Sequence, residues 1–159
     1  MFIFKQKLIG RFIFLMTAGI FLTSVASQFL LGKQPCQLCL VTRYLFLALA
    51  IAAIIFRKFK FLLPLLALVT VAFSFYHLGV ESHWWQGPRG CISELPTLDS
   101  LNGSEQINPG ISYCDRVNWT ILGFSSTLWS FLFSMFIFWI TSISFIVNYY
   151  LKKQEDNDD

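Results

Sequence analysis

Two cysteines three positions apart, Cys36 and Cys39, are followed by an arginine, Arg43, that lies inside a long apolar run. Residues three and four apart share a face of a helix, so these side chains would form one stripe that descends into a membrane. The positive end of a helix and a neighbouring arginine both favour the thiolate form of a cysteine. The stripe therefore predicts a reactive sulfur beside a positive charge, suited to binding a carbonyl oxygen of a flat ligand dissolved in the membrane.

The alternative is that these residues have no catalytic role. Cys36 and Cys39 would then form an inert surface disulfide, and the Arg43 side chain would reach back to the membrane interface. A Cys-X-X-Cys sequence alone is a weak signal. An arginine inside an apolar span is energetically costly and marks a functional candidate. Its place one turn below Cys39 therefore favours the functional interpretation.

A second pair of cysteines, Cys91 and Cys114, lies in the long polar segment of the chain. A disulfide there would stabilise the loop by about 2–4 kcal/mol, but a loop disulfide is also suited to attack by an outside thiolate. A zinc ribbon needs two close-spaced couples of cysteines, and this couple is widely spaced, so we expect no metal site. A c-type haem site would need histidine at position 40, which is leucine.

His77 and Glu81 are four positions apart at the outer end of the third apolar run. The two side chains would share a helix face, where they could pair. His77 is a candidate for contacting the membrane ligand or for relaying a proton, because histidine changes charge near neutral pH. A histidine satisfied by the backbone or by Glu81 is the alternative, and the sequence leaves it open.

The elements that would position these residues are four long apolar runs. Of the 159 residues, 55% are hydrophobic and only 13% are charged, whereas soluble domains are about 45–50% apolar and about 25% charged. A helix of about 20 apolar residues crosses a bilayer. The expected fold is an all-α membrane protein, a bundle of four transmembrane helices that forms a single domain over residues 1–159. The predicted spans are about 12–31, 36–56, 61–80 and 120–150, with loops at about 32–36 and 81–119.

The first run is longer than the apolar core of a cleaved signal peptide, which has about 7–15 residues, so we expect it to remain as a span.

With four spans both termini share one side, which holds Lys5, Lys7, Arg11, Arg57, Lys58, Lys60, Lys152 and Lys153. The other side holds Lys33, Arg89 and Arg116. Lys and Arg mark cytoplasmic ends, so both termini are predicted to be cytoplasmic. The cysteines would then face the periplasm of a bacterial inner membrane, where disulfides persist. Interfacial aromatics flank the long loop at Trp84, Trp85 and Trp119.

Several short motifs occur together: Pro35-Cys36-Gln37-Leu38-Cys39 with Arg43, His77-Leu78-Gly79-Val80-Glu81 with Trp84 and Cys91, and Cys114-Asp115 with Leu122-Gly123 and Trp129. Through them, nearly the whole chain resembles the DsbB family of membrane disulfide-forming proteins. One departure is Ser126-Thr127-Leu128, where relatives often carry Met-Ala or Met-Pro. It lies near the start of the fourth span, so we expect it to stay clear of the redox groups.

The resemblance implies an enzyme that reoxidises a DsbA-like periplasmic partner of thioredoxin fold and passes two electrons to ubiquinone or menaquinone. By position, Cys91 would form the mixed disulfide with the partner and Cys114 would exchange with Cys36. Cys39 would be the thiolate that contacts the quinone, and Arg43 would bind the quinone head group. No nucleic-acid partner is expected.

Two other interpretations compete with this one. A non-catalytic membrane scaffold or assembly subunit would use Cys91–Cys114 as a structural staple of its loop. An enzyme similar to vitamin K reductase would need a different helix order around its cysteines. That order is disfavoured here, because the Cys-X-X-Cys precedes the second span.

Overall fold

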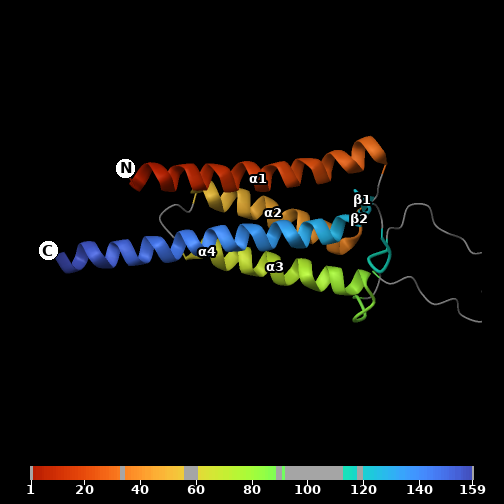
Figure 1. Ribbon diagram of the computed structural model, residues 1–159. Helices are drawn as coiled ribbons and strands as arrows, with labels where there is room; N and C mark the ends of the chain where they lie inside the picture. Colours follow the sequence, from red (N-terminus) through yellow and green to blue (C-terminus); the bar gives the residue numbers. More distant parts are fainter. Residues whose placement is uncertain are drawn as a thin grey trace, which may run out of the picture.

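The computed structural model describes residues 2–32, 35–55, 61–88, 91, 113–117 and 120–158. Its elements in chain order are α1 (Phe2–Leu31), α2 (Gln37–Ile55), α3 (Leu62–Glu81), β1 (Thr120–Ile121), β2 (Phe124–Ser125) and α4 (Ser126–Asp158). The four helices run side by side as a bundle (Figure 1), with the N-terminus of α1 and the C-terminus of α4 at the same end. The expected all-α bundle is therefore confirmed.

All four helices contain a segment long and apolar enough to cross a membrane: Leu8–Leu30, Gln37–Ile55, Leu62–Glu81 and Ser126–Leu151. The shortest has 19 residues, which at 1.5 Å per residue gives about 28 Å, close to the thickness of about 30 Å of the hydrocarbon core. Large apolar side chains cover the outside of the bundle; Leu30, for example, is 81% exposed. Such a surface suits lipid, whose tails are as apolar as these side chains.

The helices pack mainly in two pairs, α1 with α2 and α3 with α4, and α2 also contacts α3. One buried cluster ties all four helices together through Ile13, Phe46, Leu49, Ala53, Ala67 and Ile137. A second buried cluster lies at the cysteine end and contains Cys36, Leu38, Val80, Cys91 and Cys114. No comparable close packing joins the described parts of α1 and α4, which leaves room for a cavity between them.

The start of α4 differs from the prediction of a span from residue 120. Residues 120–125 instead form an antiparallel hairpin in which Ile121 pairs with Phe124. Its two-residue loop has positive φ at both positions, 54° at Leu122 and 84° at Gly123, as a type I′ turn requires. The helix begins after the hairpin because the Ser125 Oγ accepts a hydrogen bond from the Leu128 N–H at 3.2 Å and so caps the N-terminus of α4.

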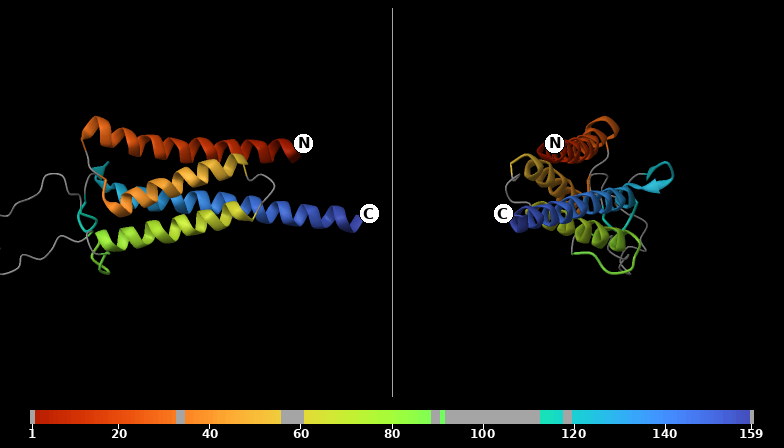
Figure 2. Two further views of the ribbon diagram at one scale, coloured as in Figure 1. Left: turned by 180° about the vertical axis from the view of Figure 1, so that it is seen from behind. Right: turned by 60° about the vertical axis from the view of Figure 1, so that its left-hand side comes forward.

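The hairpin, the start of α2 and the end of α3 all lie at the end of the bundle opposite the two termini (Figure 2). α3 ends at Glu81, where the N–H of Trp84 bonds to the Gly79 carbonyl and the N–H of His83 bonds to the Val80 carbonyl. With φ of 60° at His83, this is a Schellman motif. Most of the long loop, Trp119 and the basic turn at positions 57–60 lie outside the described residues.

Candidate redox site

A disulfide joins Cys36 and Cys39 at the start of α2, with their Cα atoms 5.0 Å apart. Cys36 precedes the helix and occupies its N-cap position, because its Sγ accepts a hydrogen bond from the Cys39 N–H at 3.1 Å. This is the bond that a Ser or Asp side chain makes at an N-cap. The first sulfur of the pair is therefore held at the positive end of α2, where negative charge is favoured.

His77 of α3 lies directly against this disulfide. Its Nε2 is 3.5 Å from the Cys36 Sγ and 3.8 Å from the Cys39 Sγ. The imidazole is almost completely buried, at 3% exposed. The sequence predicts that His77 contacts a membrane ligand or relays a proton. In the structure its imidazole contacts the sulfur atoms of Cys36 and Cys39.

Cys91 and Cys114 form the second disulfide, with Cα atoms 4.9 Å apart. A backbone hydrogen bond from the Cys114 N–H to the Cys91 carbonyl, 2.7 Å long, runs beside it. Both cysteines are buried in the same cluster as Cys36. The Cys91 Sγ also lies 4.0 Å from the Gln37 Oε1, so the two disulfides occupy one small region.

Arg43 faces α1 and is bound to it through all three of its guanidinium nitrogens. Nε donates to the Ser24 Oγ at 3.0 Å, Nη1 to the Gln28 Oε1 at 2.9 Å and Nη2 to the Ser24 carbonyl at 2.9 Å. A guanidinium has five N–H donors, so two remain for a ligand. Hydrogen bonds to α1 therefore hold the guanidinium in place.

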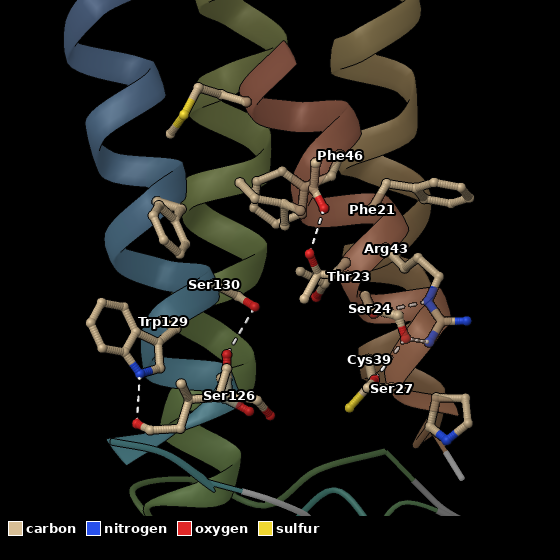
Figure 3. Close-up of a pocket in the computed structure, with 18 of the residues that line it drawn as sticks. Phe21, Thr23, Ser24, Ser27, Cys39, Arg43, Phe46, Ser126, Trp129 and Ser130 are labelled. Atoms are coloured by element: carbon tan, nitrogen blue, oxygen red, sulfur yellow. Dashed lines mark hydrogen bonds between the residues drawn. The ribbon is translucent and has the colours of Figure 1, made fainter. Parts of the chain in front are cut away.

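A cavity of about 440 Å³ lies between α1, α2 and α4 (Figure 3). Cys39 and Arg43 line it on one side, and Trp129, Ser126 and Ser130 of α4 on the other. The remaining lining residues are mostly apolar, with hydroxyl groups at Thr23, Ser24, Ser27, Thr42 and Thr127. Leu15, Gly19 and Thr23 line the cavity and are exposed on the bundle, so the cavity reaches the surface that lipid would cover.

The departure from the family pattern falls on the first residues of α4, where Ser126 and Thr127 line the cavity on the wall opposite Cys39. The Thr127 Oγ1 also donates to the Glu81 Oε2 at 2.8 Å. Glu81 therefore binds α4, while His77 contacts the cysteines.

The sequence analysis did not identify Ser24 and Gln28, whose side chains accept hydrogen bonds from Arg43. A usable signal was present, because the two residues are four apart in an apolar run and would share one helix face. Two polar side chains on one face of a span beside an intramembrane arginine are natural partners for it.

Four membrane-spanning helices with two adjacent disulfides at one end define a membrane protein of thiol–disulfide chemistry. The family model for the disulfide bond formation protein DsbB matches residues 6–143. The chain belongs to the DsbB family.

Two curated relatives carry the name disulfide bond formation protein B. The protein from Aromatoleum aromaticum is 26% identical over 150 residues, covering 81% of this chain and 86% of the relative. That from Xylella fastidiosa is 24% identical over 148 residues, covering 84% and 82%. No solved structure gives a significant match. The chain is thus a disulfide-forming oxidoreductase and a multi-pass protein of the inner membrane.

Proposed function

We propose that this protein oxidises a DsbA-like periplasmic partner of thioredoxin fold and passes the electrons to a membrane quinone. The observation that carries the proposal is the position of Cys39. Its sulfur belongs to a disulfide whose other half, Cys36, is buried against Cys91 and Cys114, while Cys39 itself lines the cavity beside Arg43. The Cys36–Cys39 disulfide therefore lies next to the second disulfide, where electrons would enter, and next to the cavity, where they would leave.

The thiol steps follow from this order of sulfurs. A thiolate of the partner attacks Cys91, which breaks the Cys91–Cys114 bond and releases the Cys114 thiolate. Cys114 then attacks Cys36, which breaks the Cys36–Cys39 bond and releases the Cys39 thiolate. The second thiol of the partner displaces Cys91 and leaves the partner oxidised. The freed Cys91 then attacks Cys114, which breaks the Cys114–Cys36 bond, restores the Cys91–Cys114 disulfide and releases the Cys36 thiolate. Two electrons then reside on Cys36 and Cys39. The shared buried cluster of Cys36, Cys91 and Cys114 supports the second step.

The partner must reach Cys91 before any of this begins. Cys91 is 0% and Cys114 1% exposed, so the first attack requires this disulfide to become exposed. A purely structural disulfide would be buried in the same way, so the burial by itself favours the alternative of a non-catalytic scaffold. A staple would resist mild reductant, whereas an exchanging pair should be reduced by the partner's dithiol.

The size and the lining of the cavity support a site for ubiquinone or menaquinone. Its volume of about 440 Å³ lies within the range of about 300–1,000 Å³ for small-molecule sites. When bound, a quinone supplies an acceptor for two electrons and two protons. The two remaining N–H groups of Arg43 would hold a carbonyl oxygen close to Cys39. The hydroxyls of Ser126, Thr127 and Ser130 offer polar contacts on the opposite wall.

His77 would act on the thiols and not on the quinone ring. Its Nε2 lies within hydrogen-bond reach of both sulfurs, so a neutral imidazole can take the proton of a thiol as the disulfide is reduced. Among the described lining of the cavity His77 does not occur. We therefore assign it to positioning and proton transfer at Cys36 and Cys39.

Filling the cavity tests this proposal without touching a cysteine. Ser130→Phe places a ring where the quinone would lie, so that the ring and the quinone would compete for the same space. We expect the KM for the quinone to rise roughly tenfold or more, while oxidation of the partner in a single turnover is retained. Ile143→Phe, at an exposed position on the same helix, is the matched control. An unchanged KM in a folded Ser130→Phe protein would contradict the site.

A further inference from the structure

We propose that Cys36, Cys39 and His77 bind one thiophilic divalent cation, with Zn²⁺ as the reference case, when the two cysteines are in the dithiol form. The inference concerns the same cysteine pair as the proposed function and rests on it for the supply of the reduced state. It assigns to the pair a second, competing ligand. The three residues come from the start of α2 and the outer end of α3.

The distances at this cluster match a tetrahedral zinc site. Zinc binds thiolate sulfur at about 2.3 Å and imidazole nitrogen at about 2.0 Å, so a sulfur and a nitrogen on one tetrahedral ion lie about 3.5 Å apart. The Nε2 of His77 is 3.5 Å from one sulfur and 3.8 Å from the other. Two sulfurs on such an ion lie about 3.8 Å apart, a separation that the pair can approach only after its disulfide is reduced.

The surroundings hold the ligands in place and leave room for a fourth. Two residues between the cysteines is the spacing of many structural zinc sites. Cys36 and His77 are buried, at 1% and 3% exposed, which fixes two of the three ligands. Two thiolates neutralise the charge of the ion, so little net charge is buried. Cys39 lines the cavity, from which water can complete the coordination.

Binding of the cation moves no electrons. Two S–H bonds lose their protons to solvent, two metal–sulfur bonds form, and the imidazole contributes its lone pair. Closing the disulfide requires both sulfurs and therefore releases the ion. A bound cation would keep the pair reduced and would occupy the Cys39 sulfur, which makes it an inhibitor of disulfide formation.

The test uses the full-length protein in detergent with Cys91→Ser and Cys114→Ser, so that Cys36 and Cys39 are its only thiols. After reduction with a phosphine, Co²⁺ is added and the thiolate-to-cobalt absorption is followed, and Zn²⁺ then displaces it. We expect one ion per protein and no signal from the disulfide form. Loss of an outer-shell partner alone typically weakens metal binding about 10–100-fold, so His77→Leu, which removes a direct ligand, should weaken it at least about tenfold.

His83→Asn is the matched control, because the chain has two histidines and His83 is exposed at the same end of α3. It should bind as the parent does. If His77→Leu fails to fold, His77→Gln replaces it with the same expectation. The inference is overturned if the reduced parent takes up no ion, or if a folded His77 variant binds as tightly as the parent. Because the phosphine supplies the reduced state, neither result bears on quinone reduction.

Discussion

At the scale of single residues, the orientation of Arg43 is determined by a helix other than its own. Ser24 and Gln28 of α1 accept hydrogen bonds from its three nitrogens. Hydrogen bonds to charged groups contribute about 1.5–3 kcal/mol each, so the guanidinium is strongly held. Its positive charge consequently stays beside Cys39 on the wall of the cavity.

This arrangement predicts a defect in quinone binding when an acceptor for Arg43 is lost. Gln28→Met keeps the length of the side chain but removes the oxygen that binds Nη1, so the guanidinium becomes free to turn away. We expect the KM for the quinone to rise about tenfold, with the rate of thiol exchange unchanged. Gln28→Glu keeps the acceptor and should keep the KM within about threefold. Steady-state kinetics with a soluble quinone measures both, and equal KM values for the two variants would argue against the assignment.

The reactive residues themselves could be predicted from the sequence, whereas their partners could not. The spacing of Cys36, Cys39 and Arg43 places them on one face of any helix, independent of the rest of the fold. The contacts of Arg43 depend on the rotation of α1 against α2, which no local pattern specifies. His77 was identified as a candidate, but its contact with the sulfurs depends in the same way on how α3 packs against α2.

At the scale of elements, the outer end of α3 is built around Gly79. The ring of Trp85 lies on this glycine at the place where a Cβ would project. The same ring stacks on Tyr76 at 8° between planes, and its Nε1 donates to the Tyr76 carbonyl at 3.0 Å. Trp85 thus folds back over the last turn of the helix that carries His77.

Gly79→Ala should therefore destabilise the protein although alanine favours helices. The new methyl group overlaps the indole, which must leave its stacked position, at a cost of about 1–3 kcal/mol. Gly19→Ala is the control, since nothing lies within 4 Å of a Cβ at that helical position, and it should be neutral or stabilising by about 0.5–1 kcal/mol. Thermal unfolding in detergent compares the two. Equal stability of both variants would show that the Trp85 contact is not maintained.

The boundaries of α4 illustrate why an element could be only partly predicted. The apolar run from residue 120 reads as one long span, because Ile121, Leu122 and Phe124 are as apolar as the helix that follows. The reversal depends on positive φ at Leu122, a conformation that leucine rarely adopts. The start of the helix is determined by the pairing of Thr120 with Ser125 in the hairpin and by the cap that Ser125 provides.

At the scale of the whole molecule, four spans were predictable because long apolar runs have few alternatives to a membrane helix. The cavity was not, because it arises where α1 and α4 fail to pack closely. Ser126 and Thr127 line the cavity because of this packing of the helices. Hydropathy reports that a segment crosses the membrane, and the packing of the segments decides what lies between them.

The distribution of basic residues predicts the orientation of the bundle. The end with both termini carries most of the Lys and Arg residues, so we expect it in the cytoplasm. Alkaline phosphatase fused after Asp159 should be inactive, and a fluorescent protein fused there should be bright. A membrane-impermeant label should reach His83→Cys, at the opposite end, in intact spheroplasts. The reverse pattern would place the disulfides in a reducing compartment and remove the basis of the electron route.

The most direct test of the account is quinone reduction by the purified protein with a reduced Cys-X-X-Cys partner as donor. The wild-type protein should reduce one quinone for each partner disulfide formed. Cys39→Ser should still form the mixed disulfide through Cys91 but should reduce no quinone, because the sulfur on the cavity wall is gone. Normal turnover by Cys39→Ser would contradict the central claim that electrons leave the protein through this sulfur.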